Sequence, residues 1–239
     1  MIDYPTFSKN LNRVQERIRA ACAACGRKPT EVTLLPVTKT QPAEAIDYVL
    51  RCGLLAVGEN RVQEVIEKLK PGVMEVRWEL IGHLQSNKAK MAVEHFSRIQ
   101  SVDSVKLLYR LERLAAEKER VLPILLQINA GDRATIETQF GVSYEGIDAL
   151  MEGALGCPHL KVEGLMTIAP PGGDSKRITA AFRRLRKTRD RLRSAFGLSL
   201  PELSMGMTGD LEIAIQEGST LVRVGTALFG KRGRVESAK

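Results

Sequence analysis

The sequence predicts an α/β protein that folds as a single (β/α)8 barrel, also called a TIM barrel, and three observations support this prediction. Strand-like apolar runs recur along the chain, a helix-like stretch follows each of them, and there are eight such runs. A chain of 239 residues that is 44% hydrophobic is long enough to close one barrel and bury its core. An open doubly wound sheet is the alternative, although no G-x-G-x-x-G opens a helix. Because no linker or low-complexity tract interrupts the chain, we expect one domain over residues 1–239.

The first element is predicted to be an amphipathic helix that Ser8 caps. Its apolar face repeats at three- and four-residue spacing and consists of Leu11, Val14, Ile18, Ala21 and Cys22. The helix is expected to end near Gly26 and Pro29, because glycine and proline commonly follow the last helical turn.

Eight strands are expected after this helix. They are residues 32–37, 54–57, 78–81, 98–102, 122–128, 160–166, 202–205 and 220–224. Segments between them carry apolar residues at helical spacing, for example 42–51, 61–69, 87–94 and 104–118. Parallel strands joined by helices place all their carboxyl ends on one rim of a barrel, where barrel proteins keep their functional residues.

Composition excludes several classes of protein. No apolar run approaches the roughly 18 to 20 residues that span a bilayer, and the N-terminus lacks a secretory signal, so we expect a cytoplasmic protein without a membrane span. A mitochondrial presequence is a weaker alternative, against which Asp3 and Glu16 count. Cys22 and Cys25 form a C-x-x-C, but no second pair completes a zinc site, so no metal is expected and the thiols are interpreted as reduced and buried.

The net charge of +8 is concentrated in residues 176–193, a predicted helix with an apolar stripe and many arginines. A solvated basic helix face explains this pattern without any partner. A nucleic-acid-binding protein that uses this helix is an alternative function, but no aromatic stacking cluster or recognition motif accompanies the charge.

The end of the chain holds two polar, glycine-containing turns about twenty residues apart, SMGMT at 204–208 and RVGT at 223–226. Each turn follows a predicted strand and precedes a predicted helix. Backbone N–H groups at a helix start attract a phosphate, and glycine lets the anion come close. In a (β/α)8 barrel the loops after strands 7 and 8 are the usual phosphate site, so these turns predict a phosphorylated ligand.

The loop after the first predicted strand contributes Lys39 to the same rim. An isolated lysine on a turn is ordinarily a solvated charge. Opposite a phosphate site, a lysine can form a Schiff base with the aldehyde of pyridoxal 5′-phosphate, which makes this cofactor the leading hypothesis. His83, in the loop 82–87, is interpreted either as a structural hydrogen-bonding residue or as a ligand contact.

Several motifs resemble the pyridoxal phosphate homeostasis protein family, and the resemblance covers almost the whole chain. The motifs are LLPVTKTQP, AVGENRVQE, WELIGHLQSNKAK, SVDS, GLMTIAP, LSMGMTGDLEIAI and STLVRVGTALFG. The resemblance implies a barrel like the N-terminal domain of alanine racemase, pyridoxal phosphate (PLP) bound to a lysine, and no robust enzymatic turnover. It further implies a role in vitamin B6 and amino-acid homeostasis.

Carried onto this chain, the resemblance makes Lys39 the Schiff-base lysine and places Arg223 at the pyridine nitrogen of PLP. The residues expected to hold or line the cofactor are further Asn60, Ser204, Met205, Gly206, Met207, Thr208, Gly225 and Thr226. An arginine cannot protonate the ring nitrogen, so the cofactor would be a poor electron sink. We expect a monomer that forms external aldimines with amino acids and does not turn them over.

The sequence also departs from the family pattern. Residues 129–141 look longer than usual and place Gln139 where a Lys-x-Gly is common, so any contact that this loop makes is in doubt. Thr208 replaces a serine but keeps the hydroxyl, and Arg61 stands where an aromatic residue is common.

A PLP-dependent amino-acid racemase is the other alternative function. A two-base racemase needs a proton donor on each face of its substrate, and Lys39 supplies one. The tyrosines Tyr4, Tyr48, Tyr109 and Tyr144 all fall within or before helix-like segments, away from the predicted rim. A non-catalytic PLP-binding protein is therefore the favoured interpretation.

Overall fold

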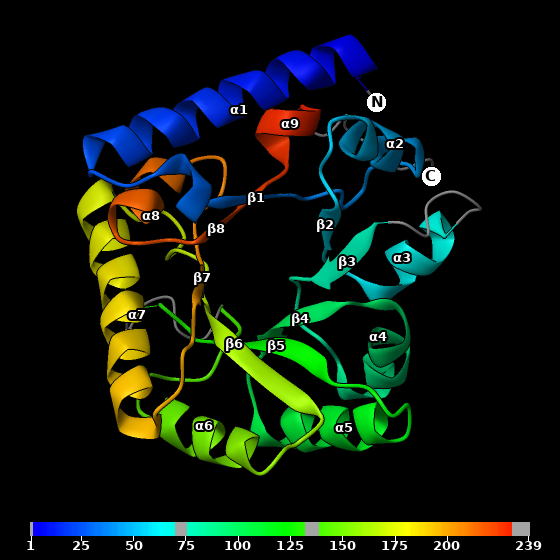
Figure 1. Cartoon of the computed structure of the whole chain (residues 1–239), viewed down its shortest axis with the longest axis vertical. Helices are drawn as coiled ribbons and strands as arrows, with labels where there is room; N and C mark the ends of the chain where they lie inside the picture. Colours follow the sequence, from blue (N-terminus) through cyan, green and yellow to red (C-terminus); the bar gives the residue numbers. More distant parts are fainter. Residues whose placement is uncertain (1, 70–75, 132–138, 231–239) are drawn as a thin grey trace.

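Eight parallel strands form a nearly closed barrel in a computed structural model that describes residues 2–69, 76–131 and 139–230 (Figure 1). The strands are β1 (Thr33–Pro36), β2 (Ala56–Glu59), β3 (Arg77–Leu80), β4 (Arg98–Val102), β5 (Leu122–Gln127), β6 (Leu160–Met166), β7 (Glu202–Ser204) and β8 (Leu221–Val224). They pair in the order β1-β8-β7-β6-β5-β4-β3-β2. A single parallel bridge between Val37 and Gly58 joins β1 to β2, where Thr38 N donates to Gly58 O over 3.1 Å.

Helices alternate with these strands on the outside of the barrel (Figure 1). They are α1 (Tyr4–Ala24), α2 (Glu44–Arg51), α3 (Val62–Lys68), α4 (Ala89–His95), α5 (Val105–Ala116), α6 (Ile147–Leu155), α7 (Ser175–Phe196), α8 (Leu211–Gln216) and α9 (Thr226–Phe229), with short 3-10 turns η1 (Pro29–Glu31) and η3 (Ser86–Lys88). The predicted fold class is confirmed, and every predicted strand coincides with an observed one to within two residues.

The predicted start of the first helix was wrong. Helix α1 begins at Tyr4, and Asp3 is its N-cap, with the carboxylate accepting a hydrogen bond from Thr6 N at 3.0 Å. Ser8 lies inside the helix. An aspartate caps a helix as well as a serine does, and Pro5 favours a start in the first turn because its fixed φ is already helical.

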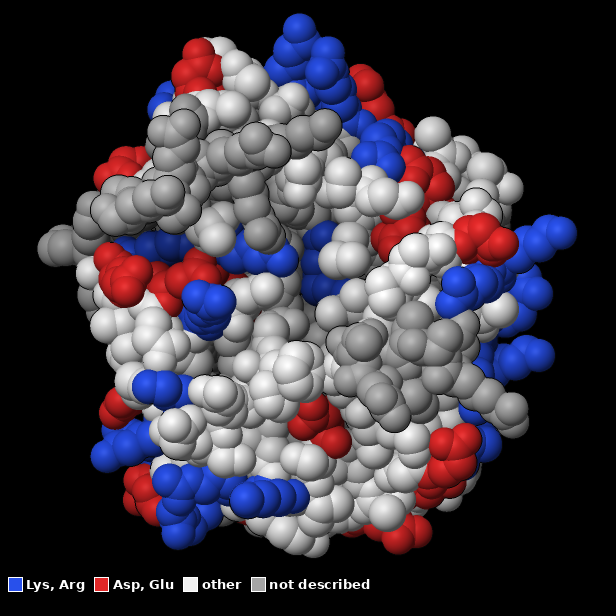
Figure 2. All heavy atoms as spheres, turned by 180° about the vertical axis from the view of Figure 1, so that it is seen from behind, with Lys and Arg blue, Asp and Glu red and all other residues white. Residues whose placement is uncertain are grey.

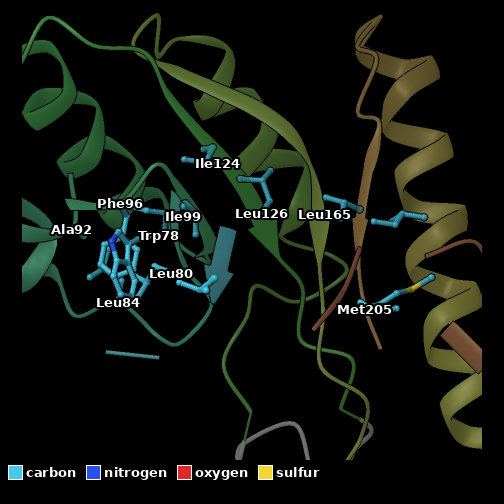
Figure 3. Close-up of a cluster of buried hydrophobic side chains, with 14 of the residues drawn as sticks. Trp78, Leu80, Leu84, Ala92, Phe96, Ile99, Ile124, Leu126, Leu165 and Met205 are labelled. Carbon is cyan, nitrogen blue, oxygen red and sulfur yellow. The ribbon is translucent and has the colours of Figure 1, made fainter. Parts of the chain in front are cut away.

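The main hydrophobic core lies between the strands and the surrounding helices. Figure 3 shows Trp78, Leu80 and Ile99 from β3 and β4 beside Ala92 and Phe96 from α4 and its end. All five side chains are buried, and they belong to one continuous cluster with the outward-facing residues of the other strands. This packing fixes where each strand ends, and therefore where the loops of the rim begin.

The interior of the barrel receives every second side chain of each strand, and it holds both an apolar cluster, of Leu35, Val37, Ile81 and Leu221, and buried polar groups. Five side chains form one hydrogen-bonded chain across it, which we call the interior chain: Arg98, Glu79, Gln100, Ser204 and Arg223. Its links are 2.8 Å from Arg98 Nε to Glu79 Oε2, 2.6 Å from Gln100 Nε2 to Glu79 Oε2, 2.6 Å from Ser204 Oγ to Gln100 Oε1, and 2.7 Å from Arg223 Nη1 to Ser204 Oγ. The chain therefore extends from β3 and β4 to β8.

Helix α1 lies across α8 and α9 on the outside of the barrel (Figure 1). Asn10 Nδ2 donates to Leu228 O of α9 at 3.0 Å. Arg17 donates to Thr208 O at 2.9 Å and pairs with Glu212 of α8 at 2.6 Å. The N-terminal helix thus fixes the two segments that follow β7 and β8.

Candidate functional site

A cavity of about 640 Å³ lies at the carboxyl ends of the strands. Loops that follow β1, β2, β3, β7 and β8 contribute to its wall. Among its lining residues are Lys39, Asn60, His83, Gln127, Phe140, Met207, Thr208, Gly209, Arg223, Gly225 and Thr226. The structure thus brings together seven of the residues predicted for the site, Lys39, Asn60, Met207, Thr208, Arg223, Gly225 and Thr226.

The loop that carries Lys39 is held on both sides of the lysine. Thr38 is fully buried; its hydroxyl donates to Glu59 Oε1 at 2.6 Å and its carbonyl accepts from Lys68 Nζ at 2.7 Å. On the other side, Thr40 has a left-handed backbone with φ 62° and its N–H donates to Glu64 Oε2 at 2.7 Å. Such a conformation is costly for a threonine, so these contacts must stabilise it.

Glu59 and Lys68 form a buried ion pair beneath this loop, with 2.6 Å between Oε1 and Nζ. Burial raises the pKa of the Glu59 carboxyl, and the neighbouring Lys68 ammonium and Thr38 hydroxyl oppose that shift. Glu59 Oε2 has no hydrogen-bond partner among the described residues. The pair joins the end of β2, helix α3 and the Lys39 loop in one cluster.

The two glycine-containing turns that follow β7 and β8, at residues 204–209 and 223–226, have backbone N–H groups at the cavity without a hydrogen-bond partner. Within the part of the chain that the structure describes, the N–H groups of Thr208, Gly209, Gly225 and Thr226 donate to no other protein group. All four residues line the cavity. The turns are also joined to each other, because Ala227 N donates to Thr208 Oγ1 at 3.3 Å. Unpartnered N–H groups on adjacent turns form a site for an anion such as a phosphate.

Arg223 is a buried cation at the wall of the cavity, with 3% of its surface exposed. Two of its five N–H groups donate within the protein, to Ser204 Oγ at 2.7 Å and to Thr167 O at 2.8 Å. Burial lowers the pKa of Arg223 to about 10, and the negative charge of Asp210 opposes that shift. The guanidinium therefore remains protonated at neutral pH.

Three predicted residues do not line the cavity. Ser204 and Met205 are fully buried, and the Ser204 hydroxyl is occupied by Arg223 and Gln100. Gly206 lies behind the turn with φ +96°, and a Cβ there would meet Ala214 Cβ at 2.5 Å. The N–H of Met207 donates to Asp210 Oδ1, so that donor is already used within the turn.

His83, which the sequence offered as a possible ligand contact, lines the cavity, but its aromatic partner Phe140 was not predicted. The His83 ring stacks on Phe140 with 3.9 Å between centroids, and His83 Nδ1 lies 3.3 Å from Asp103 Oδ2. Burial raises the pKa of Asp103, and the charge of His83 opposes that shift. Phe140 belongs to the unusual loop 129–141, whose residues 132–138 lie outside the described residues, and no local pattern indicates where such a loop will pack.

Two glutamines also reach this region. The buried side chains of Gln127 and Gln139 donate to Phe140 O and Ala169 O, and the Oε1 atom of each has no partner within the described ranges. Gln127 is the last residue of β5 and lies two residues before the expected start of the rim at residue 129, and this place near the strand end is the signal that the sequence offered.

The basic helix 176–193 corresponds to α7, and acidic residues accompany much of its charge. Arg183 and Arg186 both pair with Glu217, at 2.7 and 3.4 Å, and Arg191 pairs with Asp148 at 2.8 Å. Arg184 lies over the Tyr144 ring. Figure 2 shows positive and negative side chains interspersed over one face of the molecule, with Lys or Arg atoms at the wall of a central hollow.

Metal binding and membrane insertion both depend on features that can be assessed in residues 2–69, 76–131 and 139–230. These ranges contain no group of three His, Cys, Asp or Glu side chains placed to hold a metal ion. They also contain no helix with the length and apolar character needed to cross a membrane.

The fold and the site together define a (β/α)8-barrel protein with a cavity at the carboxyl ends of its strands, whose wall carries unpartnered backbone N–H groups, a lysine and an arginine. A family model for the alanine racemase N-terminal domain matches residues 9–233. The chain belongs to this family, and within it to the pyridoxal phosphate homeostasis proteins.

Curated relatives support this membership over nearly the full chain. A pyridoxal phosphate homeostasis protein of Aquifex aeolicus is 40% identical over 94% of this chain and 97% of its own length. The protein of the same name from Pseudomonas aeruginosa is 40% identical over 95% and 96%, and that from Escherichia coli 37% identical over 95% and 97%.

Solved structures are similar as well. A protein of unknown function from Bifidobacterium adolescentis has a TM-score of 0.89 at 34% identity, covering 96% of this chain and 98% of that one. PipY of Synechococcus elongatus, solved with PLP bound, has a TM-score of 0.77 at 38% identity, covering 89% and 100%. Alanine racemase of Clostridium difficile shares only the fold, with a TM-score of 0.75 at 14% identity.

Proposed function

We propose that this protein binds pyridoxal 5′-phosphate in the cavity at the rim and acts in intracellular PLP and amino-acid homeostasis. The observation that supports this most directly is that Lys39 and the unpartnered N–H groups of two adjacent turns line one cavity. The names of the curated relatives and the PLP-bound PipY structure support the same cofactor. We assign the function to one barrel domain over residues 1–239.

The residues present fit the chemistry of PLP. Its phosphate dianion needs several donors, and Thr208, Gly209, Gly225 and Thr226 offer N–H groups that nothing else in the described protein uses. Among the described residues that line the cavity there is no aspartate or glutamate that would repel an anion. When bound, the cofactor supplies an aldehyde that reacts with amines, and Lys39 is the amine that this wall provides.

We assign distinct roles to the site residues. Lys39 carries the cofactor as a Schiff base, and Thr208, Gly225 and Thr226 bind its phosphate together with Gly206 and Met207, which shape the first turn. Arg223 faces the pyridine nitrogen, and Asn60 lines the ring. Ser204 and Met205 act from behind the wall, Ser204 by orienting Arg223 through its hydroxyl at 2.7 Å.

Robust turnover is not part of the proposal. Arg223 keeps its own proton at neutral pH, so a ring nitrogen that faces it is not protonated by the protein. None of the four tyrosines lines the cavity, so no tyrosine there supplies the second proton donor of a two-base racemase. All four cysteines are thiols, as a reducing compartment such as the cytoplasm would keep them, and we expect a monomer there.

The test of cofactor attachment is borohydride reduction of the purified protein in the presence of PLP, followed by peptide mass mapping. We expect a pyridoxyl group on Lys39 in the wild type and none on that peptide in Lys39→Ala. Lys90→Ala, which changes an exposed lysine outside the cavity, is the matched control and should be labelled like the wild type. Modification of a different lysine alone, or no modification with excess cofactor, would refute the assignment.

Turnover is tested by incubating the PLP-loaded protein with L-alanine in D₂O and following deuterium incorporation and chirality. We expect negligible racemisation. General acid–base catalysis typically raises a reaction rate by about 10² to 10⁴-fold, and the described cavity provides Lys39 as a base but no tyrosine on the other side of the substrate. Racemisation faster than about 1 per second would establish an enzyme and replace the homeostasis proposal by the racemase alternative.

A further inference from the structure

A second cavity of about 470 Å³ adjoins the first one and has a distinct chemical character. We call it the side cavity. The start of α3 and the segment around η3 form its wall, and its lining residues are Asn60, Arg61, Val62, Gln63, Leu80, Gly82, His83, Leu84, Gln85, Lys88 and Phe140. Asn60, Gly82, His83 and Phe140 line both cavities, so the two meet along these four residues.

The boundary between the cavities is thin at Gly82. A Cβ at this position would lie 2.3 Å from Asn60 O, so only glycine lets the loop after β3 approach the loop after β2 this closely. Gly82 also adds no side chain to the boundary. The stacked rings of His83 and Phe140 form the rest of the shared wall. A small molecule at this boundary would contact both cavities.

The described side chains give the side cavity a positive charge. Arg61 and Lys88 both line it, and no aspartate or glutamate among the described residues does. Within the described residues neither side chain makes a hydrogen bond or an ion pair. Other cations of the chain, such as Arg17 and Arg98, are paired with carboxylates. Gln63 and Gln85 add amide donors to the same wall.

We propose that the side cavity is a carboxylate-binding site, in which Arg61 and Lys88 hold the carboxylate of an amino acid or 2-oxo acid whose other end reaches the first cavity. A guanidinium fork and an ammonium group are the side chains that bind carboxylates best. The proposal rests on the proposed function for the identity of the neighbouring cofactor, because a compound that approaches PLP through its amine commonly carries a carboxylate. With such a site, the protein would select amines or oxo compounds that carry a carboxylate over compounds that lack one.

The first test measures anion binding without the cofactor. Glutarate is titrated calorimetrically into protein freed of PLP, using the wild type, Arg61→Gln/Lys88→Gln and the matched control Lys90→Gln. Lys90 is an exposed lysine near Lys88 that lines neither cavity. We expect glutarate to bind the wild type and the control alike, and the double variant about tenfold more weakly, because two partly exposed charges are removed.

The second test asks whether the two cavities act together. PLP-saturated protein is titrated with L-alanine and with ethylamine, which lacks only the carboxylate, and the absorbance of the cofactor is followed. The wild type should bind L-alanine more tightly than ethylamine, and the double variant should lose about tenfold of that preference while its affinity for ethylamine stays constant.

Several outcomes overturn the proposal. Glutarate that fails to bind the wild type, or that binds all three proteins equally, shows that the side cavity holds no carboxylate. Inorganic phosphate that binds this cavity in preference to glutarate shows that it serves another anion. An unchanged preference for L-alanine in the double variant shows that the carboxylate lies elsewhere. If PLP itself does not bind, the proposed function fails, while the glutarate titration still decides the side cavity.

Discussion

Arg223 is a cation whose charge is held inside the barrel rather than at its surface. Its guanidinium donates to Ser204 Oγ and to Thr167 O, and Ser204 in turn donates to Gln100. When a buried polar group loses its hydrogen-bond partner, the free energy of unfolding falls by about 1 to 3 kcal/mol, and by more when the group is charged. The position of Arg223 at the cavity wall therefore depends on a serine that does not touch the cavity.

Replacing Ser204 by alanine tests this dependence. The change leaves both an Arg223 N–H and Gln100 Oε1 without their partner, and we expect the free energy of unfolding to fall by about 2 kcal/mol. Ser194→Ala is the matched control, because that exposed hydroxyl only donates to Asp190 O within α7; its effect should stay within about 0.5 kcal/mol. Urea denaturation measures both, and equal stability of the two variants would contradict the role given to Ser204.

Two glycines of the first turn offer a second matched pair. Gly206 has φ +96° and no room for a Cβ, whereas at Gly209 nothing lies within 4 Å of the added atom and φ is not positive. Gly206→Ala should lower the free energy of unfolding by about 2 kcal/mol or more, through backbone strain and overpacking against Ala214. Gly209→Ala should be neutral or stabilising by up to about 1 kcal/mol. The measurement is again urea denaturation, and a tolerated Gly206→Ala would show that the turn adapts.

At this scale the sequence predicted the residues that carry a recognisable backbone or charge signal. Lys39, Gly225 and Thr226 follow strands directly, so their place on the rim follows from strand ends alone. Ser204 also sits at a strand end, but its side chain points into the barrel, and the alternation of strand faces would have revealed this had it been applied to β7. Phe140 could not be predicted, because its position depends on the path of a long loop.

Among the elements, α1 has the most direct influence on the site although it lies outside the barrel. Arg17 joins it both to the carbonyl of Thr208 and to the carboxylate of Glu212 on α8. The hydrogen bond from Arg17 holds the pKa of Glu212 below its ordinary value of 4.5. A carboxylate with a lowered pKa stabilises the folded state above the unfolded value and ceases to do so as the pH falls through the lowered one.

This coupling predicts a specific pH dependence. Glu212→Gln should lower the free energy of unfolding at pH 7 by about 0.5 kcal/mol, a modest amount because both partners are more than a third exposed. The difference between wild type and variant should shrink below about pH 4.5, where the carboxylate of the unfolded wild type becomes protonated, and vanish once the pH has fallen through the lowered pKa of the folded state. Urea titrations at several pH values measure it. A difference that stays constant down to pH 3 would mean that the ion pair is not its cause.

Element boundaries could be predicted well for strands and less well for helix starts. Strands such as β5 and β8 are buried on both faces or nearly so, and their mostly apolar sequences therefore stand out. The start of α1 was misplaced because Ser8 and Asp3 are both good caps and the apolar stripe begins after both. The Lys39 loop was located correctly, but the ion pair of Glu59 with Lys68 that holds it joins separate elements and leaves no local pattern.

For the molecule as a whole, the cofactor should stabilise the barrel, since it binds the folded chain and not the unfolded one. At a concentration a hundredfold above its dissociation constant, PLP should add about 2.7 kcal/mol and raise the midpoint of thermal unfolding by roughly 5 to 10 °C. Pyridoxal, which lacks the phosphate, should raise it less, and Lys39→Ala should respond less than the wild type. Scanning fluorimetry measures all three, and an equal shift with pyridoxal would contradict phosphate binding at the turns.

The pairing of β1 with β8 has a consequence for how the protein is made. Lys39 follows the first strand and Gly225 follows the last, so the two halves of the site meet only after the chain through β8 has left the ribosome. A nascent chain that has emerged only as far as β7 can present the lysine but not the second phosphate turn. Cofactor loading would then report that synthesis has passed β8, and products truncated before this strand would remain unloaded.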